Sequence, residues 1–195
     1  MSTAQTRREY LMQEMQHRIL MLDGAQGTMI QKHKLGEHDY RGGLLEDRSV
    51  YPQDLKNNND VLVLTRPDII RDMCDRYLAA GSDIISTCTF SATSIGQHEF
   101  FHHTAPCKHD QEYYEGVLAD AELASLVRKM NSEACRIARE ATDAAEAADG
   151  RPRLVAGSIG PMAVTASLSP DVNDPGYRAV NFDQLRRAYR EQVVA

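Results

Sequence analysis

The residues with the clearest potential for chemistry stand just after a short apolar run at 19–22. Asp23 and Gly24 end this run, and a glycine-bearing turn at 24–28 follows. The carboxylate of Asp23 could accept hydrogen bonds from an ammonium group, and the N–H groups of the turn could bind a carboxylate. The alternative interpretation is that Asp23 and Gly24 only terminate a strand.

A second group of candidate ligands lies between residues 98 and 109. Histidine and cysteine are borderline metal ligands, and a zinc or copper site here, with Cys88 as a further ligand, is one hypothesis. The spacing matches no zinc-finger pattern, and Pro106 favours irregular chain, so the alternative is a solvated loop. The residues concerned are His98, His102, His103, Cys107 and His109.

The elements that must position these residues alternate between strands and helices. Apolar or β-branched runs at 19–22, 83–90 and 153–160 predict three parallel strands, the first of them fully buried. Thr65 and Asp68 match a capping box around Pro67, and this helix is predicted to stop at Gly81. Asn181 and Gln184 form a second capping box. A long helix over about 116–148 has its predicted buried stripe at Leu123, Val127, Met130, Ala134, Ile137 and Ala141.

The remaining segments are polar. Residues 1–18 predict an N-terminal helix, and residues 31–60 predict a long loop followed by a short extended or helical segment at 61–64. The surplus chain lies mainly after the carboxyl ends of the strands, where parallel α/β folds build their sites.

Composition excludes several function classes. The 195 residues contain 22 Lys and Arg against 28 Asp and Glu, a net charge of −6, which gives no basic surface for nucleic acid or for an anionic membrane. No apolar run approaches the roughly 20 residues of a membrane helix. The 4 cysteines form no CxxC pair, which is typical of reduced thiols and predicts a cytoplasmic protein.

Five motifs occur in one order along the chain. They are DGAQGTMI at 23–30, NNND at 57–60, GSDII at 81–85 before Thr89-Phe90, VAGSIGP at 155–161 and SPDVNDP at 169–175. Together they resemble the N-terminal homocysteine-binding domain of cobalamin-dependent methionine synthase, a member of the homocysteine S-methyltransferase family. The resemblance covers nearly all of 18–195, and the segment 167–181 favours methionine synthase over the betaine-using enzymes.

The resemblance implies a (β/α)8 TIM barrel, in which thiolate-bound zinc holds homocysteine and the sulfur attacks a methyl group carried by cobalamin. Such a barrel takes about 250 residues. We therefore expect an incomplete barrel with about three parallel strands, long loops and flanking helices, in a partial domain at 19–195. The resemblance also implies an insertion at about 101–122.

The same resemblance places the cofactor-binding residues elsewhere. The family's zinc cysteines, one alone and then an adjacent pair, belong beyond Ala195, so the chain is expected to contain no catalytic residue, to hold neither zinc nor cobalamin by itself and to be inactive alone. Partners would be homocysteine, at a weak or partial site, and the rest of the barrel or another chain at open sheet edges. The alternative function is a non-catalytic α/β binding or interaction module.

The residues that the resemblance assigns to homocysteine binding are Asp23, Gly24, Gly27, Thr28 and Thr89. Two segments depart from the family: 86–90 reads STCTF where Glu-Thr-Asn-Thr-Phe is usual, and 160–163 reads GPMA in place of Gly-Pro-Thr-Asn. Both departures replace polar groups in the expected site region. They therefore count against an intact function of the site.

Overall fold

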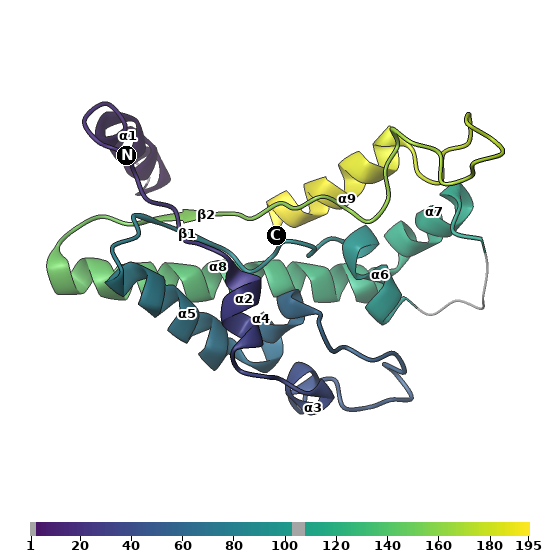
Figure 1. Cartoon of the computed structure of the whole chain (residues 1–195), viewed down its shortest axis with the longest axis horizontal. Coiled ribbons are helices and arrows are strands. Elements are labelled where there is room, and N and C mark those ends of the chain that lie inside the picture. The colour runs from purple at the N-terminus through teal and green to yellow at the C-terminus, as the bar shows by residue number, and fades with distance from the viewer. Residues whose placement is uncertain (1–2, 103–107) are drawn as a thin grey trace.

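The computed structural model describes residues 3–102 and 108–195, and it shows helices packed against a small parallel sheet (Figure 1). No helix among these residues is long and apolar enough to cross a bilayer. The elements are α1 (Thr3–Glu14), α2 (Gln26–Gln31), α3 (Glu37–Arg41), the 3-10 helix η1 (Asn59–Val61), α4 (Leu62–Thr65), α5 (Pro67–Ala79), β1 (Ile84–Ser86), α6 (Ser94–Phe101), α7 (Gln111–Ala119), α8 (Ala121–Asp149), β2 (Leu154–Ala156) and α9 (Phe182–Val194).

The sheet is parallel, as predicted, but smaller than predicted. β1 pairs with β2 in the register Ile84 to Leu154, and a single parallel bridge joins Leu22 to Ile84 on the other side of β1. The expected first strand at 19–22 is therefore reduced to one bridge. The mixed α/β architecture with parallel strands is confirmed, with β1 at the centre of three parallel segments.

The prediction that the first strand is fully buried is wrong. Ile85 of β1 is fully buried under α5 and α8, which cover one face of the sheet. Leu22 pairs with Ile84, so both side chains lie on the opposite face, and Leu22 is 54% exposed there. An apolar run indicates that a strand is hydrophobic on both faces. It does not show that the described residues cover both faces.

The long helix α8 is the main support of the fold, and Figure 1 shows it running beneath both strands. Its whole predicted stripe is buried, and α5 and α6 pack along it. The predicted start at about 116 is wrong because the helix is interrupted at Asp120. The carboxylate of Asp120 accepts the backbone N–H groups of Glu122 and Leu123 and so caps α8, separating it from α7.

Of the two predicted capping boxes, only the second is confirmed. Asn181 and Gln184 exchange side-chain and backbone hydrogen bonds at the start of α9. Thr65 instead ends α4, and its hydroxyl donates to the carbonyl of Val61, so α5 begins after Arg66 without a side-chain cap. Pro67 occupies the first turn of α5 as expected. Its ring disfavours a helical conformation of the preceding residue, and Arg66, with φ −138° and ψ 58°, separates α4 from α5.

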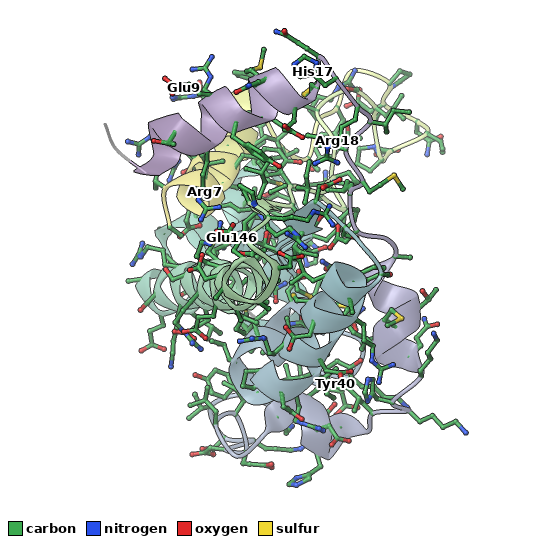
Figure 2. The ribbon with its side chains drawn as sticks, turned by 90° about the vertical axis from the view of Figure 1, so that its left-hand side faces the viewer. Arg7, Glu9, His17, Arg18, Tyr40 and Glu146 are labelled. Carbon is green, nitrogen blue, oxygen red and sulfur yellow. The ribbon has the colours of Figure 1, made fainter. Side chains whose placement is uncertain are left out.

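The helix α1 lies near the start of the strands (Figure 1), and Figure 2 shows Arg7 and Glu146 between α1 and α8. Arg7 lies over α8 and contacts Glu146 at 2.7 Å. Arg18, just after α1, makes two hydrogen bonds of 2.8 and 2.9 Å to the buried carboxylate of Asp83, which immediately precedes β1. The helix predicted over 1–18 ends at Glu14. Ion pairs join it to α8 and join the residue Arg18 after it to the start of β1.

Replacing Asp83 with asparagine is expected to lower the free energy of unfolding by about 2–3 kcal/mol at pH 7, because Arg18 loses a buried partner. The Arg18 guanidinium lowers the pKa of Asp83. The stabilisation is therefore present above the unfolded pKa of about 3.9 and is lost as the pH falls through the lower folded pKa. Urea unfolding at pH 7 and pH 3 should show the difference shrinking in acid.

The matched control is Asp72→Asn, since Asp72 is 48% exposed and pairs with Arg76 within one helix. We expect it to cost less than about 0.5 kcal/mol. Equal losses from the two variants would contradict the assignment of Asp83 as the anchor of the N-terminal segment.

Candidate functional site

A cleft of about 400 Å³ opens at the carboxyl ends of the parallel segments. Every segment that follows a strand or the Leu22 bridge contributes to it, as does η1. Its walls are formed by Leu22, Asp23, Gly24, Gln26, Gly27, Ile30, Asn59, Asp60, Ser86, Cys88, Phe90 and Ser158. Ligand sites of parallel α/β folds occur at this end of the sheet.

Asp23 is fixed in the cleft by the end of β1. Its two carboxylate oxygens accept hydrogen bonds from the backbone N–H and the hydroxyl of Ser86, at 2.9 and 2.7 Å. Gln26 donates to the Ser86 carbonyl at 2.9 Å. Each carboxylate oxygen has further lone pairs, so Asp23 can accept additional donors from a ligand.

The glycine turn continues directly into α2, whose first N–H groups have no intrahelical acceptor. Gly24 and Gly27 line the cleft. A side chain at Gly24 would meet the hydroxyl of Tyr77 at 3.0 Å, so glycine allows the turn to pack on α5. Thr28 is exposed, its hydroxyl donates to the Ala25 carbonyl, and it is not among the cleft-lining residues.

Thr89 lies behind the cleft wall and does not form part of its lining. Only 2% of Thr89 is exposed, and its hydroxyl donates to the carbonyl of Ser158 at 2.9 Å. Gln192 of α9 donates to the Thr89 carbonyl. The residues on either side, Cys88 and Phe90, face the cleft instead. Thr89 therefore joins the ends of β1 and β2.

Sequence reasoning missed Asp60, which lies in η1 and lines the cleft. The NNND motif contains Asp60, but the motif by itself indicates no role for its members. Asp60 is 5% exposed and accepts the Ser91 backbone N–H at 2.7 Å. The sequence signal that could have indicated it is the position of this acidic residue between three asparagines and an apolar run. A carboxylate that directly precedes an apolar run is buried together with it here.

The electrostatic character of the cleft is acidic. Asp23 and Asp60 line it, and no Lys, Arg or His is among its lining residues. Burial raises the pKa of Asp60 to about 6. Burial, reinforced by the Asp60 charge, also raises the pKa of the Cys88 thiol, so this thiol stays protonated at neutral pH.

The raised pKa of Asp60 has a consequence for stability. The folded state binds the proton more tightly than the unfolded state, whose pKa is about 3.9, so this group destabilises the protein as the pH rises through 4 to 6. We expect the loss of unfolding free energy caused by Asp60→Asn to be about 1 kcal/mol smaller at pH 7.5 than at pH 5. Urea unfolding of both proteins at the two pH values measures this.

Taking the difference between the two proteins cancels the other titrating groups, including His98, whose pKa is lowered by burial. The control is Asp54→Asn, since Asp54 is 74% exposed. Its difference from the wild-type protein should not change between the two pH values. If the difference in unfolding free energy between the wild-type protein and Asp60→Asn does not change with pH, burial of the Asp60 charge does not destabilise the protein.

The histidine-rich segment forms an aromatic cluster in its described part. The ring of His98 packs edge-on against His109, Tyr113 and Tyr114, and its Nδ1 contacts the Ile95 carbonyl. His102 contacts Asp120 at 2.8 Å. His103 and Cys107 lie outside the described residues, and within residues 3–102 and 108–195 no three His, Cys, Asp or Glu side chains are placed to hold a metal.

The same observation tests the zinc site that the resemblance implies. The described side chains do not fit a thiolate zinc centre: Cys74 and Cys88 are buried free thiols, and Cys135 is exposed on α8. We therefore derive no chemical step through zinc from these residues.

Comparison with known proteins identifies relatives of the chain. A family model described as homocysteine S-methyltransferase matches residues 20–195. The homocysteine methyltransferase MmuM from Escherichia coli, in its metallated form, superposes with a TM-score of 0.57 and 20% identity over 92% of this chain and 50% of that one. Its oxidized form gives 0.50 and 21% over 75% of this chain and 39% of that one. The chain thus spans half or less of these structures, and at this identity the likeness establishes the fold.

Proposed function

We propose, because the chain belongs to the homocysteine S-methyltransferase family, that its cleft binds homocysteine for methyl transfer to the thiol sulfur. The observation that carries the proposal is the acidic cleft at the carboxyl ends of the parallel segments, with Asp23 fixed on its wall. The cavity has the size expected for a small ligand.

In this proposal the polar end of homocysteine occupies the Asp23 side of the cleft. Asp23 accepts the ammonium group, and the N–H groups of the turn from Gly24 through Gly27 to Thr28 bind the carboxylate. Thr89 acts indirectly, by holding Ser158 in the cleft wall. The uncharged residues Ile30 and Phe90 leave an apolar region for the side chain of the ligand.

We propose further that the chain is of the methionine synthase type, with cobalamin as methyl carrier, on the support of the segment 167–181. The free thiols of Cys74, Cys88 and Cys135 support a cytoplasmic location.

Activation of the sulfur by zinc would need ligands other than the described side chains. We therefore expect the purified chain to form no methionine from homocysteine and methylcobalamin, and turnover by this chain alone would contradict that expectation.

A second candidate function is a binding module that pairs with the rest of a barrel or with another chain. The observation in its favour is a group of exposed apolar side chains in and after the parallel segments: Leu22, Phe90 and Ile159 are each more than half exposed. An exposed apolar face beside unpaired strand edges favours association. Size-exclusion chromatography tests this function, because a monomer at all concentrations would argue against it.

The binding proposal predicts that Asp23→Asn weakens L-homocysteine binding by about 10- to 100-fold, because a hydrogen bond to a charged group is lost. Isothermal titration under reducing conditions measures the change. Asp171→Asn is the control, since Asp171 is exposed in the loop before α9 and lies outside the cleft. Equal affinities of wild-type and Asp23→Asn proteins would contradict the proposed site.

A further inference from the structure

We propose that Asp60 is a specificity-determining residue, a second carboxylate that recognises the ammonium group of the ligand in the cleft. This inference rests on the proposed function and deepens it, since neither the family match nor the sequence motifs assign a role to Asp60. It makes the cleft a site for amino acids in preference to simple thiols.

The position of Asp60 is fixed by a buried network of neutral groups. Its Oδ2 accepts the Ser91 backbone N–H at 2.7 Å and the Gln97 side-chain amide at 3.4 Å. Gln97 is itself held, because Asn58 donates to its Oε1 at 2.7 Å and Gln97 donates to the Ser91 carbonyl at 3.1 Å. The network joins η1, the end of β1 and α6, and it holds the carboxylate against the cleft.

The charge of Asp60 is not balanced by any basic side chain in the described part of the chain. The buried carboxylate of Asp83 differs in this respect, since Arg18 pairs with it. A buried carboxylate without a cation is costly, and a cationic ligand would offset that cost. The pKa of about 6 agrees with this interpretation, because it reflects burial with no compensating positive charge.

The chemistry of the cleft favours an ammonium group over a metal ion. The neighbouring Cys88 thiol is buried and protonated, and the described residues offer no set of three metal ligands. An ammonium group has three N–H donors, and both Asp23 and Asp60 offer free lone pairs in the same cavity. Both carboxylates line the same cavity, so a primary ammonium group bound there would meet a carboxylate acceptor.

The first experiment uses n-butylammonium chloride as the probe and needs no thiol ligand. Aspartate carboxyl carbons are labelled with 13C, and the Asp60 signal is assigned by its absence in Asp60→Asn. We expect the probe to shift this signal saturably and to lower its titration midpoint, while sodium chloride at equal concentration does neither. The control is the signal of Asp68, which is 63% exposed. An Asp60 signal that moves no more than that of Asp68 would overturn the inference.

The second experiment compares L-homocysteine with 4-sulfanylbutanoic acid, which lacks the amino group. The wild-type chain should prefer homocysteine by at least about 10-fold, and Asp60→Asn should reduce the preference to within about 3-fold. Gln97→Met is the matched variant: it removes part of the network and lowers stability, but it keeps the charge and should keep the preference. A merely structural role for Asp60 predicts that both variants behave alike.

The two experiments separate this inference from the proposed function. If the probe shifts Asp60 but homocysteine does not bind, ammonium recognition stands and homocysteine fails as the substrate. If homocysteine binds and Asp60→Asn keeps the full preference, the role of Asp60 is overturned while the proposed function stands.

Discussion

Replacing Arg41 with methionine is expected to cost about 3–5 kcal/mol, enough to unfold much of a domain whose total stability is of the order of 5–15 kcal/mol. Arg41 is 2% exposed although its side chain ends in a guanidinium group. Its guanidinium contacts Glu37 at 2.6 Å and donates to the carbonyls of Leu45, Tyr51 and Gln53. One side chain thus organises the polar segment that leads to η1.

The loss should extend beyond this segment. Glu37 also accepts the backbone N–H groups of Leu55 and Lys56, so removing Arg41 leaves its carboxylate with only backbone donors and the distant Arg48. Since η1 follows directly, Asp60 would lose its fixed position in the cleft. Thermal unfolding followed by circular dichroism measures the effect.

Arg48→Met is the control for Arg41, because Arg48 belongs to the same segment but is 53% exposed and pairs with Asp54 on the surface. It should cost less than about 1 kcal/mol. If both variants unfold at the same temperature, the segment is not organised around Arg41.

The second large effect is expected from Gly160→Ala, which should cost about 2–3 kcal/mol through overpacking. A Cβ atom at Gly160 would lie 2.4 Å from the Phe90 carbonyl oxygen and 2.7 Å from the Phe90 ring. The Gly160 N–H donates to that same carbonyl at 2.9 Å, so the two segments cannot separate without losing this hydrogen bond. Because Phe90 lines the cleft, the substitution should also weaken ligand binding.

Gly157→Ala is the matched control within the same segment. No atom lies within 4 Å of a Cβ built there, and its φ is not positive. Alanine should therefore leave stability unchanged or raise it by up to about 0.5 kcal/mol, since it restricts the unfolded chain. Urea unfolding of both variants measures the contrast, and a similar loss from each would contradict the close packing of Gly160 on Phe90.

The helices could be predicted from the sequence where local signals and burial agree. The apolar stripe of α8 and the capping box of α9 depend on residues three and four apart, and such contacts form within one helix. Thr65 shows the limit of local signals. The preceding apolar residues continue into α4, so Thr65 ends one helix before Pro67 starts another.

The features that could not be predicted depend on contacts between distant segments. The helix α3 and the burial of Arg41 arise from carbonyl groups up to 12 residues away, which have no sequence pattern. The exposure of Leu22 depends on what covers the second face of the sheet, and an apolar run carries no information about that. Whether 101–122 is an insertion remains a prediction.

The candidate site could be predicted in part. Asp23, Gly24 and Gly27 line the cleft because a strand end fixes their direction. Thr28 and Thr89 do not line it: Thr28 occupies an exposed position of α2, and Thr89 is buried between Cys88 and Phe90, which face the cleft. Asp60 was missed because its role depends on burial and on the absence of a cation in the cleft lining.

The central claim is that homocysteine binds in the cleft at the carboxyl ends of the strands. Chemical-shift mapping of the 15N-labelled chain, titrated with L-homocysteine under reducing conditions, tests it most directly. We predict that the amide signals of Gly24, Gly27 and Ser86 shift together and saturate, while those of Val164 and Leu168, in a separate cavity, do not move. Saturable shifts confined to that separate cavity, or no saturable shift at all, would contradict the account.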